Sequence, residues 1–360
     1  MVCSAKDLIS LNSRRVSISN ASAQLASGKK EFGSCAATST GIACEPLGTI
    51  LSDICLTFCL LREFWHNHFT VYRTKASFLW KGASVPINSQ LILPPKALAS
   101  CIAGRIVRDT LGTELSDADR VNYFPASPLF TITLTLSGQL HVADGILELE
   151  ALRKQPVAPA RLFQSPKTEP HMSWSSGPIW AMKIAFFPDA WLRLGGTLEG
   201  RPPENIQHAL GLLEAEYLNT AWPSFWSEML TVWAQSEDSN RFANWTGSDR
   251  IKDWTYHLMG KLVQTGPGRG MRSAQRRLQR WTGLNKQTLE FFTKVEDVHR
   301  LISADPTTSP ADLAAEAGFA DQSHMGRALK RATGFSPVRL NQKIATEESF
   351  WCYRLLGERF

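Results

Sequence analysis

Short runs rich in β-branched residues alternate with turn residues between positions 89 and 190. Over residues 130–136, apolar and hydroxyl side chains alternate, which is typical of a strand with one buried face. Residues 105–109 form a similar run, and so do residues 180–187, which end at Pro188. Several short strands at this spacing predict a β-sandwich or barrel.

From residue 204 onward the apolar spacing changes to three or four residues, which is the period of an amphipathic helix. Three sets of apolar residues show this spacing: Ile206, Leu210 and Leu213; Trp226, Leu230 and Trp233; and Trp254, Leu258 and Leu262. A break at residues 266–268, Gly-Pro-Gly, then interrupts the pattern. We therefore expect a helical linker over residues 198–264, which could serve in dimerisation, before a separate C-terminal unit.

Two short helices joined by a tight turn are predicted between residues 309 and 334. Ser309 is a favourable N-cap, Pro310 suits the first helical position, and Gly318 can end the helix with a positive φ. Asp321 can cap a second helix, which runs to about residue 333 and stops at Gly334. Such a pair of helices is a helix-turn-helix.

The second of these helices separates an apolar face from a hydrogen-bonding face. Met325, Leu329 and Ala332 share one side at helical spacing. The opposite side carries Gln322, Ser323, Gly326, Arg327 and Lys330. Arginine can bind guanine, and glutamine can bind adenine, through paired hydrogen bonds in the major groove of DNA. A merely solvated helix face has the same pattern, so the face alone leaves both interpretations open.

The charge distribution favours DNA binding. The 360-residue chain has a net charge of +6, and residues 265–345 hold thirteen Lys and Arg against seven Asp and Glu, which accounts for the whole excess. A basic excess on a small helical unit favours a polyanionic partner, nucleic acid first. The overall composition, 43% hydrophobic and 20% charged with a mean hydropathy of −0.16, excludes a mostly disordered chain, a collagen-like chain and a polytopic membrane protein.

The helix-turn-helix also resembles a known family. The string Gly318-Phe319-Ala320-Asp321-Gln322-Ser323-His324, followed by Arg327, Lys330-Arg331, Thr333-Gly334 and Ser336-Pro337, is similar to the signature of AraC/XylS-type transcriptional regulators. This resemblance implies a DNA-binding unit of two helix-turn-helices joined by a long helix, which here would span residues 288–302. It also implies that the rest of the chain senses an effector.

Residues 272–283 resemble the first recognition helix of that family, although more loosely. Arg272, Arg276 and Gly283 stand where the family has Arg, Arg and Gly. Gly270 stands where the family usually has a capping Ser, and Leu278 replaces its usual aromatic residue. These two departures concern how the first recognition helix docks on DNA.

The upstream part of the chain resembles the sensor domain of a subset of these regulators, over residues 122–128 and 187–191. The resemblance implies a cupin-like β-barrel followed by helices, so the expected fold class is α+β. We expect five parts: a poorly ordered extension (1–44), a β-rich sensor domain (45–197), the helical linker (198–264), the double helix-turn-helix domain (265–345) and a tail (346–360). The resemblance carries over no ligand-binding residue.

The expected function is sequence-specific binding of double-stranded DNA by a transcriptional regulator that responds to an unidentified small-molecule effector. We expect no enzymatic activity, cofactor or metal. The candidate DNA-binding residues are Gln322, Ser323, His324, Arg327, Lys330, Arg331, Arg272, Gln275 and Arg276. Two recognition helices on a rigid connector would enter successive major grooves about 34 Å apart. Contact with RNA polymerase, homodimer formation, and the choice between activation and repression stay open.

Two alternatives come from other features of the chain. Cys35, Cys44, Cys55 and Cys59 could form the zinc or methyl-acceptor site of a DNA-repair and regulator hybrid, but their spacing lacks the two close pairs that such a site favours. Cys55 and Cys59 lie in an apolar run, where cysteine usually packs as a small hydrophobic residue. The second alternative is an interaction protein that senses but no longer binds DNA specifically.

Three histidines are further candidates for a metal or ligand site. His66 and His68 have the spacing of a cupin metal site, but no glutamate follows at the required distance. His171 could line a ligand pocket or be a satisfied, partly buried residue.

The first thirty residues lack a continuous apolar run, and residues 47–61 are shorter than the roughly 20 residues that a membrane span requires. We therefore predict a cytoplasmic, nucleoid-associated protein without membrane contact.

Overall fold

A computed structural model describes residues 71–73, 88–215, 218–236, 251–264 and 270–357. All of them belong to one compact unit, Phe58–Phe360. The candidate cysteines, His66 and His68 lie outside the described residues. No helix within the described ranges is long and apolar enough to cross a membrane.

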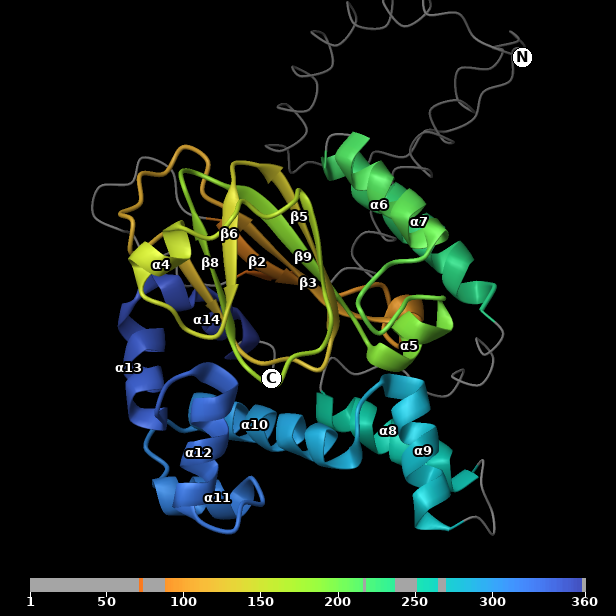
Figure 1. The fold of residues 1–360 in the computed structure, drawn as a ribbon, viewed down its shortest axis with the longest axis vertical. Helices are drawn as coiled ribbons and strands as arrows, with labels where there is room; N and C mark the ends of the chain where they lie inside the picture. The colour runs from red at the N-terminus through yellow and green to blue at the C-terminus, as the bar shows by residue number, and fades with distance from the viewer. Residues whose placement is uncertain (1–70, 74–87, 216–217, 237–250, 265–269, 358–360) are drawn as a thin grey trace, which may run out of the picture. The chain divides into compact units, whose positions relative to one another are not determined.

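The first part of this unit consists of two antiparallel sheets (Figure 1). The larger has the strand order β1-β2-β3-β9-β5-β7, and the smaller has the order β4-β8-β6. The strands are β1 (Val71–Arg73), β2 (Asn88–Ile92), β3 (Ile102–Asp109), β4 (Val121–Phe124), β5 (Phe130–Ser137), β6 (Leu140–Asp144), β7 (Arg161–Gln164), β8 (His171–Ser175) and β9 (Trp180–Phe186). The three strands predicted from the sequence correspond to β3, β5 and β9.

Strand β5, which lies between β9 and β7, is covered on both faces rather than on one. Ile132 and Leu134 are fully buried in the main hydrophobic core, and Thr133 on the opposite face is also buried, with 7% of its surface exposed. Thr133 lines a space between the two sheets, because the smaller sheet covers that face. The alternation of hydroxyl and apolar residues correctly predicted a strand, but the hydroxyl side faces a second sheet instead of solvent.

Helices cover the other face of the larger sheet. They are η1 (Lys96–Leu98), α5 (Pro188–Arg193), α6 (Glu204–Ala215) and α7 (Leu218–Ala234), while α4 (Leu149–Arg153) follows β6. Trp191, Ile206, Leu210 and Phe225 are buried together with strand residues in one core. Arg105 projects from β3 toward these helices, where its guanidinium lies 3.1 Å from the ring centroid of Trp222.

The remainder of the unit is helical, so the predicted order of a β-rich region followed by helices is confirmed. Its elements are α8 (Ile251–Gln264), α9 (Met271–Thr282), α10 (Lys286–Ala304), α11 (Pro310–Glu316), α12 (Gln322–Thr333), α13 (Pro337–Thr346), η3 (Glu348–Phe350) and α14 (Trp351–Gly357). Helix α10 is the long connector, and Figure 1 shows α9 and α12 at its two ends.

The predicted caps of α11 and α12 have the expected geometry. The side chain of Ser309 accepts a hydrogen bond from the backbone N–H of Asp312, and that of Asp321 accepts one from the N–H of His324 at 2.6 Å. Gly334 ends α12 in the left-handed conformation, with φ of 83°. These local signals set the helix boundaries because each satisfies backbone groups that the helix itself leaves unpaired.

Candidate nucleic-acid interface and interior cavity

Helix α12 has one buried face and one exposed face. Met325, Leu329 and Ala332 are at most 2% exposed. Met325 and Leu329 pack against Val298 of α10 and Leu313 of α11 in one small core. The helix-turn-helix is therefore held on the connector by its apolar residues, as the spacing of these residues predicted.

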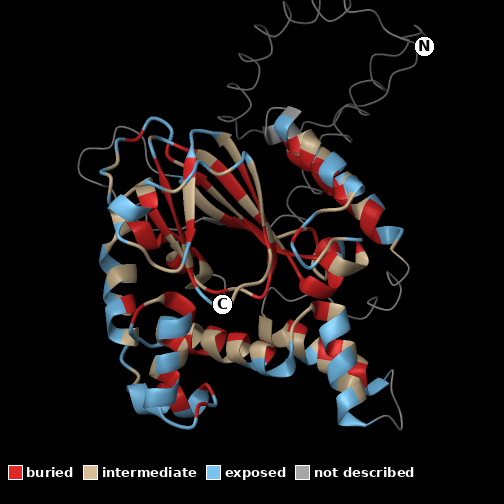
Figure 2. Ribbon diagram, viewed as in Figure 1, coloured by how far each residue is buried: buried red, intermediate tan, exposed pale blue. Residues whose placement is uncertain are grey.

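The polar face of α12 is open. Figure 2 shows exposed residues along the outer side of α12, and the candidate residues on this helix are all exposed: Gln322, Ser323, His324, Arg327, Lys330 and Arg331. Two of them also contact aromatic rings of the same unit. The ring of His324 meets Phe319 edge to face at 5.4 Å, and the guanidinium of Arg331 lies 5.0 Å from the centroid of Phe291. Helix α12 therefore presents its polar side chains to solvent.

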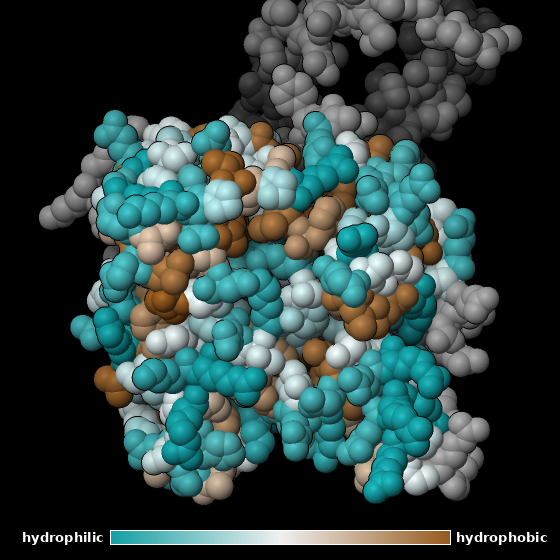
Figure 3. Space-filling model, viewed as in Figure 1, coloured by the Kyte–Doolittle hydropathy of each residue, from teal (hydrophilic) through white to brown (hydrophobic). Residues whose placement is uncertain are grey.

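Helix α9 also exposes donor-rich side chains. Arg272, Gln275 and Arg276 are exposed, whereas Leu278 and Thr282 are buried. Figure 3 shows hydrophilic side chains over α9 and over α11 and α12 on the face in view. At the start of α9, Gly270 has no side chain to cap the helix. Hence α9 has the exposed arginines that DNA binding requires, but it lacks the N-terminal cap of α12.

The two helices end in the same way. Thr282 donates a hydrogen bond to the carbonyl of Leu278, and Thr333, fifty-one residues later, donates one to the carbonyl of Leu329, both at 2.8 Å. Gly283 and Gly334 follow with φ of 72° and 83°. This match places α9 and α12 in one common register, in which Arg276 corresponds to Arg327.

Helix α8 packs beside α9 and was not recognised from the sequence as its partner. Trp254, Leu258 and Leu262 of α8 share a core with Leu278 of α9 and Leu289 of α10. The apolar spacing predicted this helix, but the glycine-rich break after it suggested a linker instead of the first half of a helix-turn-helix. We infer that α8 and α9 correspond to α11 and α12.

A carboxylate of α10 holds the start of α8. Glu296 is 8% exposed, and its two oxygens accept hydrogen bonds from the backbone N–H groups of Ile251 and Lys252 at 2.9 and 3.0 Å. A negative charge at a helix N-terminus is favourable because it meets unpaired N–H groups and the positive end of the helix dipole. No local sequence signal predicts this contact, since forty-four residues separate Lys252 from Glu296.

A largely apolar cavity of about 180 Å³ lies between the β sheets and the C-terminal helices. Strand residues such as Leu91, Thr131 and Ala185 form one side. The helices α10, α12 and α14 form the other side through residues that include Val298, Leu329 and Cys352. A cavity of this size in an apolar surrounding is large enough for a small organic molecule.

Lys183 is the only lysine that lines this cavity within the described part of the chain. Its ammonium donates to Nε2 of His171 at 2.8 Å and to Oε1 of Gln164 at 3.2 Å, and it lies 4.2 Å from the ring centroid of Phe124. The described residues provide no carboxylate partner for it. Burial lowers the pKa of Lys183 to about 8. Burial and the nearby Lys183 charge lower the pKa of His171 well below its ordinary value, so the imidazole is neutral and accepts the hydrogen bond.

His171 is a half-buried histidine with a hydrogen-bond partner in Lys183, and it also lines the cavity, so both roles that the sequence left open are found in the structure. Its ring stacks on Phe124 at 4.8 Å. Lys183 was not singled out from the sequence, where it appears only as one polar residue in a predicted strand. Within the described residues, no group of three or more His, Cys, Asp and Glu side chains is placed to bind a metal ion.

Comparisons with known proteins give distant structural matches. No family model and no curated protein matches the chain. A structure of ToxT from Vibrio cholerae is 13% identical, covers 61% of this chain and 93% of its own, and has a TM-score of 0.30. A second ToxT structure, with an unsaturated fatty acid bound, is 12% identical, with the same coverage and a TM-score of 0.29.

A third match is CuxR, an AraC-like transcriptional activator. It is 11% identical, covers 84% of this chain and 95% of its own, and has a TM-score of 0.20. Hydroxypropylphosphonic acid epoxidase from S. wedmorenis covers only 33% of this chain, at 13% identity and a TM-score of 0.22. These matches assign no role to any residue of this chain.

Proposed function

We propose that this chain is a sequence-specific DNA-binding transcriptional regulator of the AraC/XylS type. The observation that carries the proposal is the pair α9 and α12, two exposed, donor-rich helices in a common register at the ends of one connecting helix. Arg276 and Arg327 occupy the same position in the two helices, and both are exposed. Each can form two hydrogen bonds to a guanine in the major groove.

The test is binding to oligonucleotides selected from a random pool by the full-length protein. Arg327→Ala and Gln322→Ala should each weaken binding to the selected sequence by about 10- to 100-fold, because a bidentate base contact contributes about 1–3 kcal/mol. The matched control is Lys96→Ala, which removes one exposed charge from the β-rich part and should leave the affinity unchanged. Affinity that depends only on salt, with no loss in either variant, would instead support the interaction protein without base recognition.

We also propose that the cavity binds the effector, an apolar molecule with a carboxylate. The cavity wall is mostly apolar, and the ammonium of Lys183 is buried in it without an acidic partner among the described residues. A buried charge of this kind is unfavourable until an opposite charge approaches it. A ligand whose carboxylate pairs with Lys183 and whose hydrocarbon chain fills the cavity would match both the buried ammonium and the apolar wall.

Calorimetry with decanoate, decanol and decylamine tests this site, because the three probes share a chain and differ in charge. Decanoate should bind most tightly, and Lys183→Met should remove that preference while the exposed Lys154→Met leaves it intact. Because a carboxylate favours the ammonium form, affinity should be greatest below the pKa of Lys183, about 8, and fall above it by about tenfold per pH unit. Equal binding of decanol and decanoate would contradict the proposal.

Lys183→Met should also change the stability of the protein. The lowered pKa means that the folded state binds this proton less readily than the unfolded chain, so the charged lysine destabilises the fold below pH 8. At pH 7 the variant should therefore gain stability, by up to about 3 kcal/mol in the free energy of unfolding. The gain should shrink as the pH rises from 8 toward 10.5, which urea denaturation at several pH values would measure.

A further inference from the structure

The last described residues of the chain dock on the sheets. The segment from Glu347 to Gly357, here called the C-terminal clasp, follows α13 directly and comprises η3 and α14. Trp351, Cys352 and Leu355 share a core with Leu91 of β2. Phe350 stacks on Tyr123 of β4, with ring centroids 4.6 Å apart. Hence the end of the second helix-turn-helix is packed onto the β-rich part.

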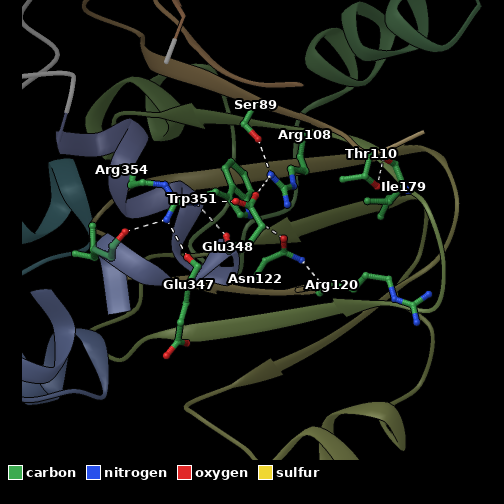
Figure 4. Close-up of polar contacts among 11 residues, drawn as sticks. Ser89, Arg108, Thr110, Arg120, Asn122, Ile179, Glu347, Glu348, Trp351 and Arg354 are labelled. Carbon is green, nitrogen blue, oxygen red and sulfur yellow. Dashed lines mark hydrogen bonds and ion pairs between the residues drawn. The ribbon is translucent and has the colours of Figure 1, made fainter. Parts of the chain in front are cut away.

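Two buried polar contacts give this docking a defined geometry (Figure 4). Arg108 of β3 donates to Oε1 of Glu348 at 2.7 Å, and the two side chains are 6% and 11% exposed. The indole N–H of Trp351 donates to Oδ1 of Asn122 at 2.7 Å in a buried position. Both contacts are buried and directional, so together they favour one position of the clasp on the sheets.

Arg354 ties the clasp to the end of α13 through hydrogen bonds. Its guanidinium donates to the carbonyls of Ile344 and Glu347 at 2.9 and 2.8 Å and pairs with Glu348 at 3.0 Å. Figure 4 shows Arg354 between these groups and the pair of Arg108 and Glu348. A movement of α13 together with α12 would therefore strain the contacts of Glu348 and Trp351 with the sheets.

The clasp restrains the helix-turn-helix unit without covering its polar face. The core around Val298 of α10 sets the position of α12 on the connector, and the clasp adds no contact to that core. Its polar contacts run to Arg108 of β3 and Asn122 of β4, and to α10, where the carbonyl oxygen of Tyr353 lies 3.2 Å from Nε2 of His299. A backbone hydrogen bond from Ala126 to the carbonyl of Ala332, at 2.8 Å, holds the same end. These contacts restrict how far α12 can adjust to a DNA groove, while its base-reading side chains stay exposed.

We propose that the C-terminal clasp is an autoinhibitory contact that holds α12 on the sheets and is released when the protein binds DNA. The inference rests on the proposed DNA-binding function. Any movement of α12 relative to the sheets as it enters a DNA groove breaks these contacts, so every contact that fixes this end to the sheets opposes the movement. Release of the clasp therefore raises DNA affinity.

Two variants weaken the clasp; the first keeps an aromatic ring at the position, and the second keeps the shape of the side chain. Trp351→Phe removes the indole donor to Asn122, and Glu348→Gln removes the charge opposite Arg108. Both should bind the selected DNA about 5- to 20-fold more tightly than wild type. The control is Glu150→Gln, the same substitution in the exposed ion pair with Arg153, which should leave affinity unchanged. Anisotropy measures the affinity, and thermal melting establishes that each variant is folded.

Hydrogen exchange of the wild-type chain is a second measurement that needs no variant. The amides of the clasp should exchange faster in the DNA complex than in the free protein. Unchanged or weaker DNA binding by both folded variants would overturn the autoinhibitory role of the clasp. The same conclusion would follow if the clasp amides were equally protected from exchange in the DNA complex and in the free protein. Failure of the wild type to select any DNA would instead overturn the proposed function, so the two failures are distinguishable.

Discussion

Helices α9 and α12 are two versions of one element, and they differ mainly where they begin. Both end with a threonine that bonds back to a leucine carbonyl and with a left-handed glycine. At the start, α12 has Asp321 as a cap, whereas Gly270 of α9 has no side chain that could accept from the first N–H groups. The C-terminal end of each helix is therefore fixed by a local threonine and glycine pair. The N-terminal end can form without a capping side chain, because packing against neighbouring helices holds the helix in place.

The glycines that end α9 and α12 differ in the space around them. A Cβ at Gly334 would overlap Ile146 near its backbone, whereas one at Gly283 would meet the end of Leu198, a flexible and half-exposed side chain. Gly334→Ala should therefore lower the free energy of unfolding by about 3 kcal/mol, and Gly283→Ala by about 1 kcal/mol. Urea denaturation measures both, and equal losses would show that the two stops are equally constrained.

The second effect concerns which bases the two helices recognise. In the common register Arg276 matches Arg327, but Met271 matches Gln322 and Arg272 matches Ser323. The two half-sites should therefore share a guanine at one equivalent position and differ at the others. Arg276→Ala should remove only the preference for guanine at that position of the first half-site. The binding free energy should fall by about 1–3 kcal/mol. Selected sequences from the variant would contradict the common register if that guanine were retained.

The third effect concerns the helix starts and has opposite signs in the two helices. Asp321→Ala should destabilise the protein by about 1 kcal/mol because it removes the acceptor for the N–H of His324. Gly270→Asp supplies an acceptor at the equivalent position and should stabilise it by a few tenths of a kcal/mol. Thermal melting of the pair is the measurement. A loss of stability in the second variant would mean that the start of α9 does not resemble that of α12.

The smallest effect concerns the salt dependence of DNA binding. Arg280 of α9 and Lys330 of α12 are both exposed and lie one position apart in the common register. If each neutralises one phosphate, substitution by Ala should reduce the slope of log affinity against log salt by about 0.9 without changing the preferred sequence. A changed sequence preference would assign the residue to base recognition instead.

The sequence was sufficient for the second helix-turn-helix because its signals are local. Ser309, Asp321 and Gly334 each act within one turn of their helix, and the spacing of Met325 and Leu329 marks the buried face. Its exposed donors could be identified in the same way, since on this helix the polar residues opposite the buried face are exposed. Whether these donors contact DNA stays a prediction that the binding experiments address.

The cavity, the clasp and the pairing of α8 with α9 could not be predicted in this way. Lys183 becomes distinctive only when the sheets and α14 close around it, and the partner of Trp351 lies 229 residues away in the chain. Glu296 reaches the start of α8 from a different helix. Each of these features depends on long-range packing, which leaves no periodic pattern in the sequence.

The common register of α9 and α12 has a consequence for the layout of a binding site. Symmetric dimers recognise inverted half-sites, because a twofold axis relates their two helices. Here one chain carries both helices in tandem, each with the same order from cap to glycine stop. A single chain should therefore recognise a directional site without palindromic symmetry. Turning that site around would point the β-rich part of the protein toward the opposite end of the DNA.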